Sequence, residues 1–397
     1  MMRVLHIIGT LNPESGGPAS TVAALMDFSR PECENEVVSL DDPNAAYLRD
    51  LDFAVNALGP TSVKYGYTPK LLPWLEQNGE RFDGVVVHGL WQYCGYAARK
   101  AFEGRRPYLV FAHGMLDPYF KRAFPFKHFK KWVYWLLVEH WVLRGAYRVL
   151  FTNIEEEKLA RQSFSLNQWS DHVVPIGATF PPGDDGDRKQ TFLSLFPQLR
   201  GRRYLLFLGR IDRKKGCDLL IDAFVQVAST DPDLHLVMAG PDEQQWRTEL
   251  ERAVFKADLA SRVHWTGMLT GAEKWGAFLA AEAFVLPSHQ ENFGVAVAEA
   301  MASGKAALLS DKVNIASEIA EADAGLVEED TLAGTRRLLT NWIAMSPEER
   351  QSMGDHARRL FEQRYDMRIN AGEVTRLFWQ AMRPSASIVT TPDPALK

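Results

Sequence analysis

Two glutamates with seven residues between them lie in the segment LPSHQENFGVAVAEAMASG, which spans residues 286–304. Glu291 belongs to a polar loop between an expected strand and an expected helix of small residues that stops at Gly304. Glu299 lies about one and a half turns into that helix, so its side chain can point back towards the helix start. Backbone N–H groups at a helix start attract anions. Together these groups suit a ligand with hydroxyls and phosphate, such as a nucleotide sugar.

A basic loop in the second half of the chain favours this ligand site over the alternative, which is a buried alanine-rich helix with solvated glutamates. The loop has the pattern GR-x4-KG and follows an expected strand, which places Arg210 and Lys215 beside the next helix start. Arginine can bind phosphate through two hydrogen bonds, and lysine adds a point charge. Two cations here would neutralise a diphosphate leaving group. A solvated basic turn remains the other interpretation.

Gly16, Gly17 and Pro18 connect an expected strand to an expected helix near the N-terminus. A glycine has no Cβ and therefore lets the backbone approach a ligand closely. The pattern is not the GxGxxG fingerprint of a dinucleotide site. A phosphate contact and a tight strand-to-helix turn explain it equally well.

Two histidines, His88 and His113, end expected strands and are each followed by glycine. Ligands of doubly wound sheets collect at this end of the strands, where a histidine can hydrogen-bond a sugar or phosphate oxygen. The alternative is a histidine satisfied by neighbouring backbone groups. We favour His113 as the site residue because a tight turn ending at Asp117 follows it.

Short apolar segments alternate with helical segments along both halves of the chain, which predicts α/β domains with parallel, doubly wound sheets. The expected strands span 4–8, 36–40, 53–57, 84–88, 108–113 and 148–152, then 204–208, 234–239, 263–266, 283–286 and 306–309. We predict a first Rossmann-like domain over 1–180, a linker and the start of the second domain over 181–200, and a second Rossmann-like domain over 201–365. A helix over 366–383 and a disordered tail over 384–397 follow. The aspartates within 180–189 are interpreted as solvated linker residues and not as a metal cluster.

The composition is that of an ordinary globular chain, since 46% of the 397 residues are hydrophobic, 24% are charged and the formal net charge is −5. This charge gives no reason to expect nucleic acid as a partner. The three cysteines lack the spacing of a metal site or a disulfide framework, which fits a reducing compartment. No signal peptide or transmembrane segment is expected. We therefore predict a cytoplasmic protein without a metal or cofactor.

The segment from Lys121 to Trp141 combines basic and aromatic residues in a partly helical pattern. Such a segment is a candidate for contact with an anionic membrane surface, here the inner face of the membrane. The competing interpretation places the aromatic residues in the core and the lysines on a solvated face. No recognisable nucleic-acid module surrounds the segment.

Three motifs occur in the order Gly16-Gly17, GR-x4-KG and PSxxENFG-x4-EAMASG. In this order they resemble glycosyltransferase family 4, whose members are retaining, nucleotide-sugar-dependent enzymes with the GT-B fold. The resemblance extends from the first strand to the last helix. The segments HGLWQYCGYAARKA and HGMLDPYFKRAF look like those of a subgroup common in bacterial surface-polysaccharide synthesis.

The resemblance implies a role for each matching residue. Glu299 would bind the ribose hydroxyls, and Glu291 would bind the transferred sugar. The other groups implied at the donor are the diphosphate-binding Gly16, Gly17, Arg210 and Lys215, and the backbone of Asn292, Phe293, Gly294 and Val295. His113 would lie beside the transferred sugar, which completes a catalytic set of His113, Arg210, Lys215 and Glu291.

The resemblance also implies an arrangement of two Rossmann-like domains facing a central cleft, with the helix over 366–383 crossing back to the first domain. The chain departs from the family at Asn314-Ile315, where a Gly-Gly pair is frequent. Contacts to the sugar near residue 314 are therefore left open.

These observations predict transfer of a hexosyl unit from a nucleoside diphosphate sugar to an acceptor hydroxyl, with retention at the anomeric carbon. The first domain would bind a lipid-linked or oligosaccharide acceptor, in the synthesis of bacterial cell-surface polysaccharide or lipopolysaccharide. Two alternatives remain open. One is a nucleotide-sugar epimerase or hydrolase on the same scaffold, and the other is a non-catalytic sugar-nucleotide-binding protein.

Overall fold

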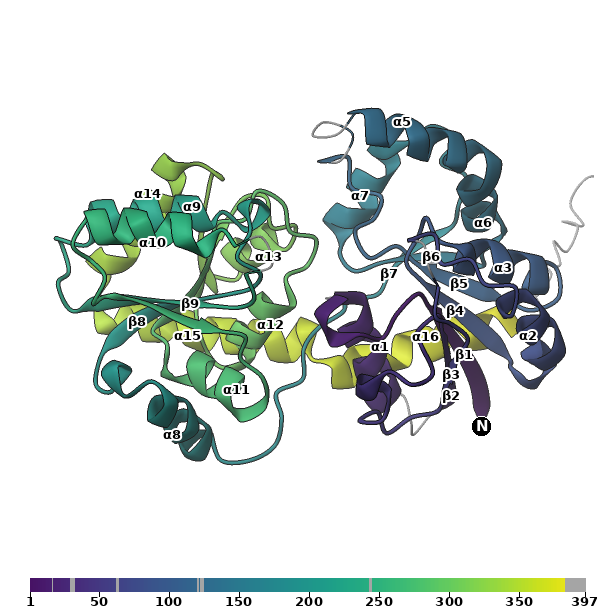
Figure 1. Cartoon of the computed structure of the whole chain (residues 1–397), viewed down its shortest axis with the longest axis horizontal. Coiled ribbons are helices and arrows are strands. Elements are labelled where there is room, and N and C mark those ends of the chain that lie inside the picture. Colours follow the sequence, from purple (N-terminus) through teal and green to yellow (C-terminus); the bar gives the residue numbers. More distant parts are fainter. Residues whose placement is uncertain are drawn as a thin grey trace, which may run out of the picture.

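The computed structural model describes residues 1–15, 17–28, 33–61, 64–119, 121, 125–242 and 245–382. These residues form two α/β domains, each built on one parallel sheet (Figure 1). The predicted fold class is confirmed. The predicted tail over 384–397 lies outside the described residues.

The first domain has a seven-stranded sheet in the order β3-β2-β1-β4-β5-β6-β7. Its strands are β1 (Met2–Ile8), β2 (Cys33–Ser39), β3 (Val55–Ala57), β4 (Gly84–His88), β5 (Tyr108–Phe111), β6 (Arg148–Phe151) and β7 (Asp171–Val173). Strands β4 to β6 are almost wholly buried, as expected of a parallel sheet covered on both faces. The sequence did not predict β7, because this edge strand is half-exposed and has no apolar run.

The second domain has a six-stranded sheet in the order β10-β9-β8-β11-β12-β13. Its strands are β8 (Arg203–Leu208), β9 (Leu234–Ala239), β10 (Val263–Gly267), β11 (Ala283–Leu286), β12 (Ala307–Ser310) and β13 (Gly325–Glu328). Strand β13 was also not predicted, and it too is a short edge strand. In each sheet the first strand has neighbours on both sides, which is the topological switch point where ligands of such sheets bind.

Helices cover both sheets. In the first domain they are α1 (Gly17–Phe28), α2 (Leu71–Asn78), α3 (Tyr93–Phe102), α5 (Pro125–Tyr134), α6 (His140–Gly145) and α7 (Ile154–Ser163). The second domain has α8 (Asp185–Leu195), α9 (Cys217–Val227), α10 (Arg247–Lys256), α11 (Gly271–Ala280), α12 (Val295–Ala302), α13 (Ala316–Glu321), α14 (Leu332–Ala344) and α15 (Pro347–Leu360). Of the described helices, none is long and apolar enough to cross a membrane.

The stretch 180–189, predicted as a linker, is helical from Asp185 onwards. Asp184 caps α8 by accepting hydrogen bonds from the backbone N–H groups of Gly186 and Asp187. The helix packs closely on α11, with Phe192 fully buried. The aspartates that suggest a solvated linker are therefore a helix start, where acidic residues are favourable.

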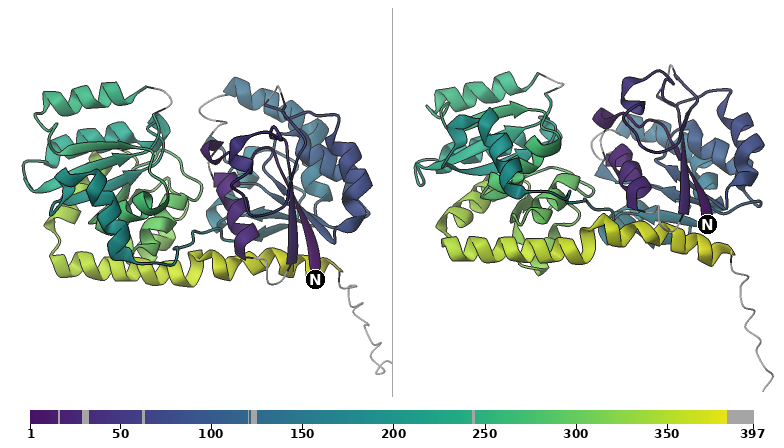
Figure 2. Two further views of the ribbon diagram at one scale, coloured as in Figure 1. Left: turned by 60° about the horizontal axis from the view of Figure 1, so that its bottom comes forward. Right: turned by 90° about the horizontal axis from the view of Figure 1, so that it is seen from below.

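The last helix, α16 (Met367–Met382), returns to the first domain. The yellow segment α15–α16 runs along both domains in each view (Figures 1 and 2). A Cβ on Gly84 would lie 2.3 Å from the ring of Phe378, so α16 sits directly on the start of β4. The side chains of His172 and Glu373 also meet, 2.9 Å apart. This confirms the predicted crossing of the last helix.

The chain passes between the two domains twice, and the two passages touch. Residues 361–365 form a π-helical turn between α15 and α16, and Ala178 bridges to Asp366. A Cβ on Gly177 would lie 1.7 Å from the carbonyl oxygen of Tyr365, so only glycine fits here. The two crossings are thus fixed to each other by close backbone packing.

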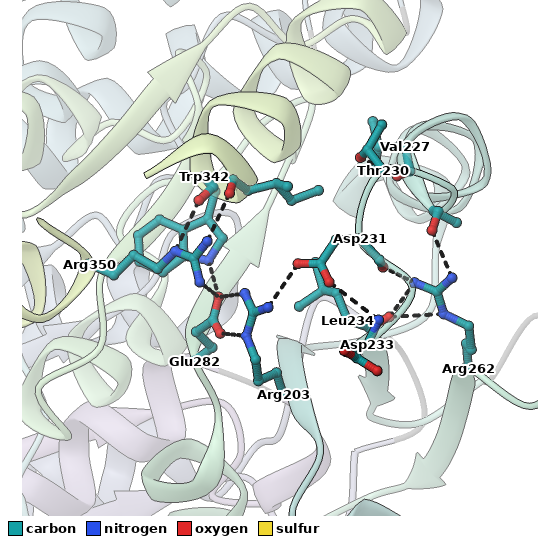
Figure 3. Close-up of polar contacts among 12 residues, drawn as sticks. Arg203, Val227, Thr230, Asp231, Asp233, Leu234, Arg262, Glu282, Trp342 and Arg350 are labelled. Carbon is teal, nitrogen blue, oxygen red and sulfur yellow. Dashed lines mark hydrogen bonds and ion pairs between the residues drawn. The ribbon is translucent and has the colours of Figure 1, made fainter. Parts of the chain in front are cut away.

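A polar network closes the amino end of the second sheet (Figure 3). Arg203, at the start of β8, donates two hydrogen bonds to the carboxylate of Glu282, of 2.5 and 3.1 Å, and one of 2.9 Å to Asp231. The same carboxylate accepts from the indole of Trp342 at 2.7 Å and from Arg350 at 3.1 Å. Glu282 therefore ties two strands to α14 and α15.

Glu282→Gln should lower the unfolding free energy by about 1–3 kcal/mol, because a carboxylate with four donors loses its charge and part of its acceptor capacity. Urea unfolding checks this. The matched control is Glu251→Gln, because its partner Arg247 is half-exposed, as Arg203 is. We expect that control to change stability by less than about 0.5 kcal/mol. Equal effects of the two substitutions would contradict a special role for Glu282.

Candidate functional site

Lys215 and Glu291 form an ion pair at the switch point of the second sheet. Lys215 ends the 3-10 turn Arg213–Lys215 after β8, and Glu291 lies in the loop after β11. Strands β8 and β11 are neighbours, so the loops at their carboxyl ends meet. Both side chains are largely buried, with exposed fractions of 16% and 15%. The structure therefore brings two of the predicted catalytic residues into direct contact.

The charge of Glu291 is set by several neighbours. Burial alone would raise the pKa of this carboxyl group, but the charge and hydrogen bond of Lys215, with the charges of Lys214 and Arg210, outweigh it and hold the pKa below its usual value. Arg210 is half-exposed and lies 3.5 Å from Asp212. Glu291 is thus an ionised carboxylate surrounded by three cations.

The helix start next to this cluster offers backbone donors. Gly294 is the N-cap of α12 and adopts the left-handed conformation, with φ of 73°. The first N–H groups of a helix have no partner within it, so those of Val295 and the residue after it are available to an anion. Phe293 is buried, and its ring meets Tyr365 edge-on at 5.5 Å. Its packing anchors the loop from which the helix begins.

Glu299 is paired with a lysine that the sequence analysis did not identify. Its Oε1 accepts a hydrogen bond of 2.6 Å from Lys274 of α11, and both side chains are largely buried. The sequence offers a weak signal for Lys274, since it stands near the start of an amphipathic helix among apolar residues. The ion pair holds the carboxylate in place, which is compatible with the ribose role that the family resemblance implies.

The side chain of Asn292 bonds to the first domain. Its amide donates 3.1 Å hydrogen bonds to Thr152 and to Glu156, while its backbone carbonyl accepts one of 2.8 Å from Asn153. A second contact between the domains joins the amide of Gln290 to Asp117 at 2.8 Å. The loop with Glu291 is therefore fixed between the two domains.

Glu156, at the start of α7, organises the first domain at this contact. It accepts hydrogen bonds from the backbone N–H groups of Gly114 (2.6 Å) and Thr152 (2.7 Å). Burial raises the pKa of this carboxyl group, although these hydrogen bonds and the one from Asn292 oppose the shift. No pattern in the sequence indicates Glu156, because it is one of three consecutive glutamates in an ordinary helix start.

His113 lies beside this contact. The next residue, Gly114, packs so closely against Asn292 that a Cβ there would lie 2.8 Å from the asparagine side chain. The imidazole of His113 is hydrogen-bonded to that of His88, which the sequence analysis considered and set aside. The structure therefore places His113 of the first domain next to the loop of the second domain that carries Glu291.

The structure describes the surroundings of three other residues from the sequence analysis, Gly16, Gly17 and Asn314, only in part. Gly17 is the first residue of α1, and a Cβ there would meet no atom within 4 Å, so the space beside it is open. Gly16 lies outside the described residues. Asn314 donates a 3.2 Å hydrogen bond to the side chain of Asn292, so the departure from the family pattern lies against the loop with Glu291. Within the part of the chain that the structure describes, no three His, Cys, Asp or Glu side chains gather as a metal site.

Comparisons with known proteins agree with this geometry. The family model described as "Glycosyl transferase 4-like domain" matches residues 16–177, and "Glycosyl transferases group 1" matches residues 196–360. Among solved structures, sucrose-phosphate synthase from Thermosynechococcus elongatus has a TM-score of 0.74 at 19% identity, covering 96% of this chain and 99% of that one. Anabaena HepE, in complex with UDP and glucose, has a TM-score of 0.75 at 18% identity, covering 96% and 100%.

Curated relatives match over shorter stretches. The mannosylfructose-phosphate synthase of Agrobacterium fabrum is 29% identical over 175 residues, which are 41% of this chain and 37% of that protein. The lipopolysaccharide core biosynthesis mannosyltransferase LpsB of Rhizobium meliloti is 31% identical over 143 residues, 35% of this chain and 39% of that protein. The chain thus spans less than half the length of these relatives.

The likeness to solved structures over nearly the whole chain defines the class: this is a protein of the GT-B fold. Because each domain also matches a glycosyltransferase model, the chain belongs to glycosyltransferase family 4.

The lowered pKa of Glu291 predicts how stability depends on pH. A carboxyl group whose pKa is lower in the folded state contributes stability above its unfolded pKa of about 4, and the contribution is lost as the pH falls through the folded-state pKa. We expect the difference in unfolding free energy between wild type and Glu291→Gln to be largest near neutral pH and to shrink below about pH 4. Urea titrations at several pH values measure it.

For comparison, Glu251→Gln removes a half-exposed carboxylate and should differ little from wild type at any pH. If the Glu291→Gln difference stayed constant down to about pH 3, Glu291 would not be the ionised partner of Lys215.

Proposed function

We propose that this chain transfers a hexosyl unit from a nucleoside diphosphate sugar to an acceptor hydroxyl, with retention at the anomeric carbon. The observation that carries the proposal is the cluster of Lys215, Arg210 and Glu291 beside the start of α12, at the switch point of a sheet in a family 4 chain. Two relatives, a mannosyltransferase and a mannosylfructose-phosphate synthase, support a hexosyl donor.

The main task of the site in this reaction is to stabilise the charge of the leaving diphosphate. When the diphosphate leaves, negative charge grows on its oxygens while the sugar becomes oxocarbenium-like. Lys215, Arg210 and the N–H groups at the start of α12 lie where they can stabilise that charge. No metal is needed if the two cations fulfil this role, which remains a prediction.

The acceptor hydroxyl needs a base, and the departing phosphate oxygen can serve as one. When the configuration is retained, the phosphate leaves from the same face of the sugar that the acceptor approaches. No separate carboxylate pair is therefore required. Glu291 and His113 would then orient the hydroxyls of the transferred sugar. Glu299, fixed by Lys274, would bind the ribose.

Arg210→Ala and Lys215→Ala should each lower kcat at least about 100-fold, because each removes a charge that stabilises the leaving group. The measurement is release of nucleoside diphosphate from a panel of nucleotide sugars with and without an acceptor. Arg213→Ala is the matched control, because Arg213 lies in the same loop but is 68% exposed and pairs with Glu249. It should retain near-normal turnover.

Near-normal turnover of both Arg210→Ala and Lys215→Ala would overturn the assignment. Release of diphosphate without any acceptor would favour the hydrolase or epimerase, and binding without any release would favour a non-catalytic protein. Thermal shift with nucleoside diphosphates adds a test of binding, since a ligand of the folded state alone raises its apparent stability.

We further propose that a membrane surface presents the acceptor, as expected for a lipid-linked substrate of surface-polysaccharide or lipopolysaccharide synthesis. In the segment from Lys121 to Trp141, Phe126, Phe129 and Leu137 are 88%, 65% and 71% exposed. Helix α5 lies on the side of the first domain opposite α16 (Figure 2). Trp135, by contrast, is fully buried, so part of the aromatic pattern belongs to the core. Exposed apolar side chains next to lysines favour insertion at an anionic lipid surface.

Phe129→Asp and Leu137→Asp should each reduce flotation with vesicles containing about 30% anionic lipid several-fold, because the apolar anchor is lost and a repelled charge is added. Phe255→Asp is the control, since Phe255 is 77% exposed on α10 of the other domain. Unchanged flotation of the first two variants would mean that the segment from Lys121 to Trp141 is an ordinary solvent-exposed surface.

A further inference from the structure

Three histidines cross three neighbouring strands of the first sheet. His6 lies in β1, His88 is the last residue of β4, and His113 follows β5 by two residues. The register pairs Ile8 with His88 and His88 with Phe111, so each histidine lies two residues further along than the one before. The row therefore runs diagonally from the interior of the sheet to its carboxyl edge at the switch point.

The three imidazoles are joined end to end. Nδ1 of His6 lies 3.0 Å from Nε2 of His88, and Nδ1 of His88 lies 3.1 Å from Nε2 of His113. The ring centroids are 5.3 and 5.4 Å apart, with planes inclined by only 20° and 25°. Because each centroid separation exceeds the N···N distance by about one ring diameter, the rings meet edge to edge and nearly in one plane. Both contacts are therefore well-aligned hydrogen bonds.

All three rings are neutral. Burial lowers the pKa of His6 to about 4 and that of His113 to about 3, and it lowers the pKa of His88, which also faces the other two. A neutral imidazole has one N–H donor and one bare nitrogen. Three such rings supply three protons, and the two contacts use one each. The third proton must lie at one end of the row.

Both bonds of the row must therefore point the same way. If His6 carries its proton on Nε2, His88 donates to His6 and His113 donates to His88, so all three rings are Nε2–H tautomers. If His6 carries its proton on Nδ1, each ring donates to the next and all three are Nδ1–H tautomers. The tautomer of His113 is thus tied to that of His6, two strands away.

We propose that His6 and His88 are positioning residues that hold the ring of His113 and tie its tautomer to their own, so that its Nδ1 is presented to a hydroxyl of the transferred sugar. Among the described residues no hydrogen-bond partner of this Nδ1 is found, and His113 is partly exposed beside the loop with Glu291. A hydroxyl can donate to a bare nitrogen or accept from an N–H group. This role rests on the proposed function; the shared tautomer of the row does not.

The direction of the row can be measured in the full chain without substrate. Histidine-selective ¹⁵N labelling and two-bond ¹H–¹⁵N correlation spectra distinguish the two tautomers and the charged ring. We expect His6, His88 and His113 to share one tautomer and not to titrate between about pH 5.5 and about pH 8. Finding His113 as a different tautomer from His6 or His88 would overturn the proposal.

Two variants test whether the distant residues act through His113. His6→Phe keeps a ring but removes both nitrogens, and His88→Phe does the same at the middle of the row, should the first variant not fold. Each should change the ring ¹⁵N signals of His113 and lower kcat/KM about 3- to 10-fold, as expected from one lost hydrogen bond. Unchanged His113 signals in both variants would refute the relay.

The second domain provides a matched control. His235 and His264 form a similar pair, with an N···N distance of 2.9 Å, on neighbouring strands that do not contact His113. His235→Phe should leave the His113 signals and kcat/KM unchanged. If wild type transferred no sugar from any donor while His6, His88 and His113 shared one tautomer, the proposed function would fail and the coupling along the row would stand.

Discussion

The hydrogen bonds of Asn292 join the two domains where the strands of both sheets end, and the rest of the site depends on them. Its amide donates to Thr152 and Glu156, and its carbonyl accepts from Asn153. Parallel strands deliver their loops to one edge of a sheet. With the bond from Gln290 to Asp117, the hydrogen bonds of Asn292 bring the loop of Glu291 against the turn that follows His113. Residues almost 180 positions apart in the chain thereby share one environment.

Pairing of buried charges explains how this environment is stable before a ligand binds. Lys215 is paired with Glu291, and Lys274 with Glu299. A single buried charge would cost several kcal/mol, so each lysine needs its carboxylate. On the proposed function, a diphosphate offers Lys215 another anionic partner. In the first domain the histidines are instead neutral, and hydrogen bonds join them to one another.

Much of the fold follows from local patterns in the sequence. Each buried strand has a continuous apolar run, and all the predicted strands are present. The two that were missed, β7 and β13, are short edge strands, whose half-exposed residues carry no such pattern. Helix α8 was missed for a related reason. Its acidic first turn has the composition of a linker, and only the packing of Phe192 on α11 shows its place.

The sequence by itself determined the parallel α/β architecture, the family and the loops that contribute Arg210, Lys215, Glu291 and Glu299, because these depend on residue spacing within single segments. Only the tertiary structure decided which side chains meet. It paired Lys274 with Glu299, turned the side chain of Asn292 towards the first domain, and aligned His6 and His88 with His113. Such contacts depend on strand order and register, which arise from packing the whole chain and leave no local pattern in the sequence.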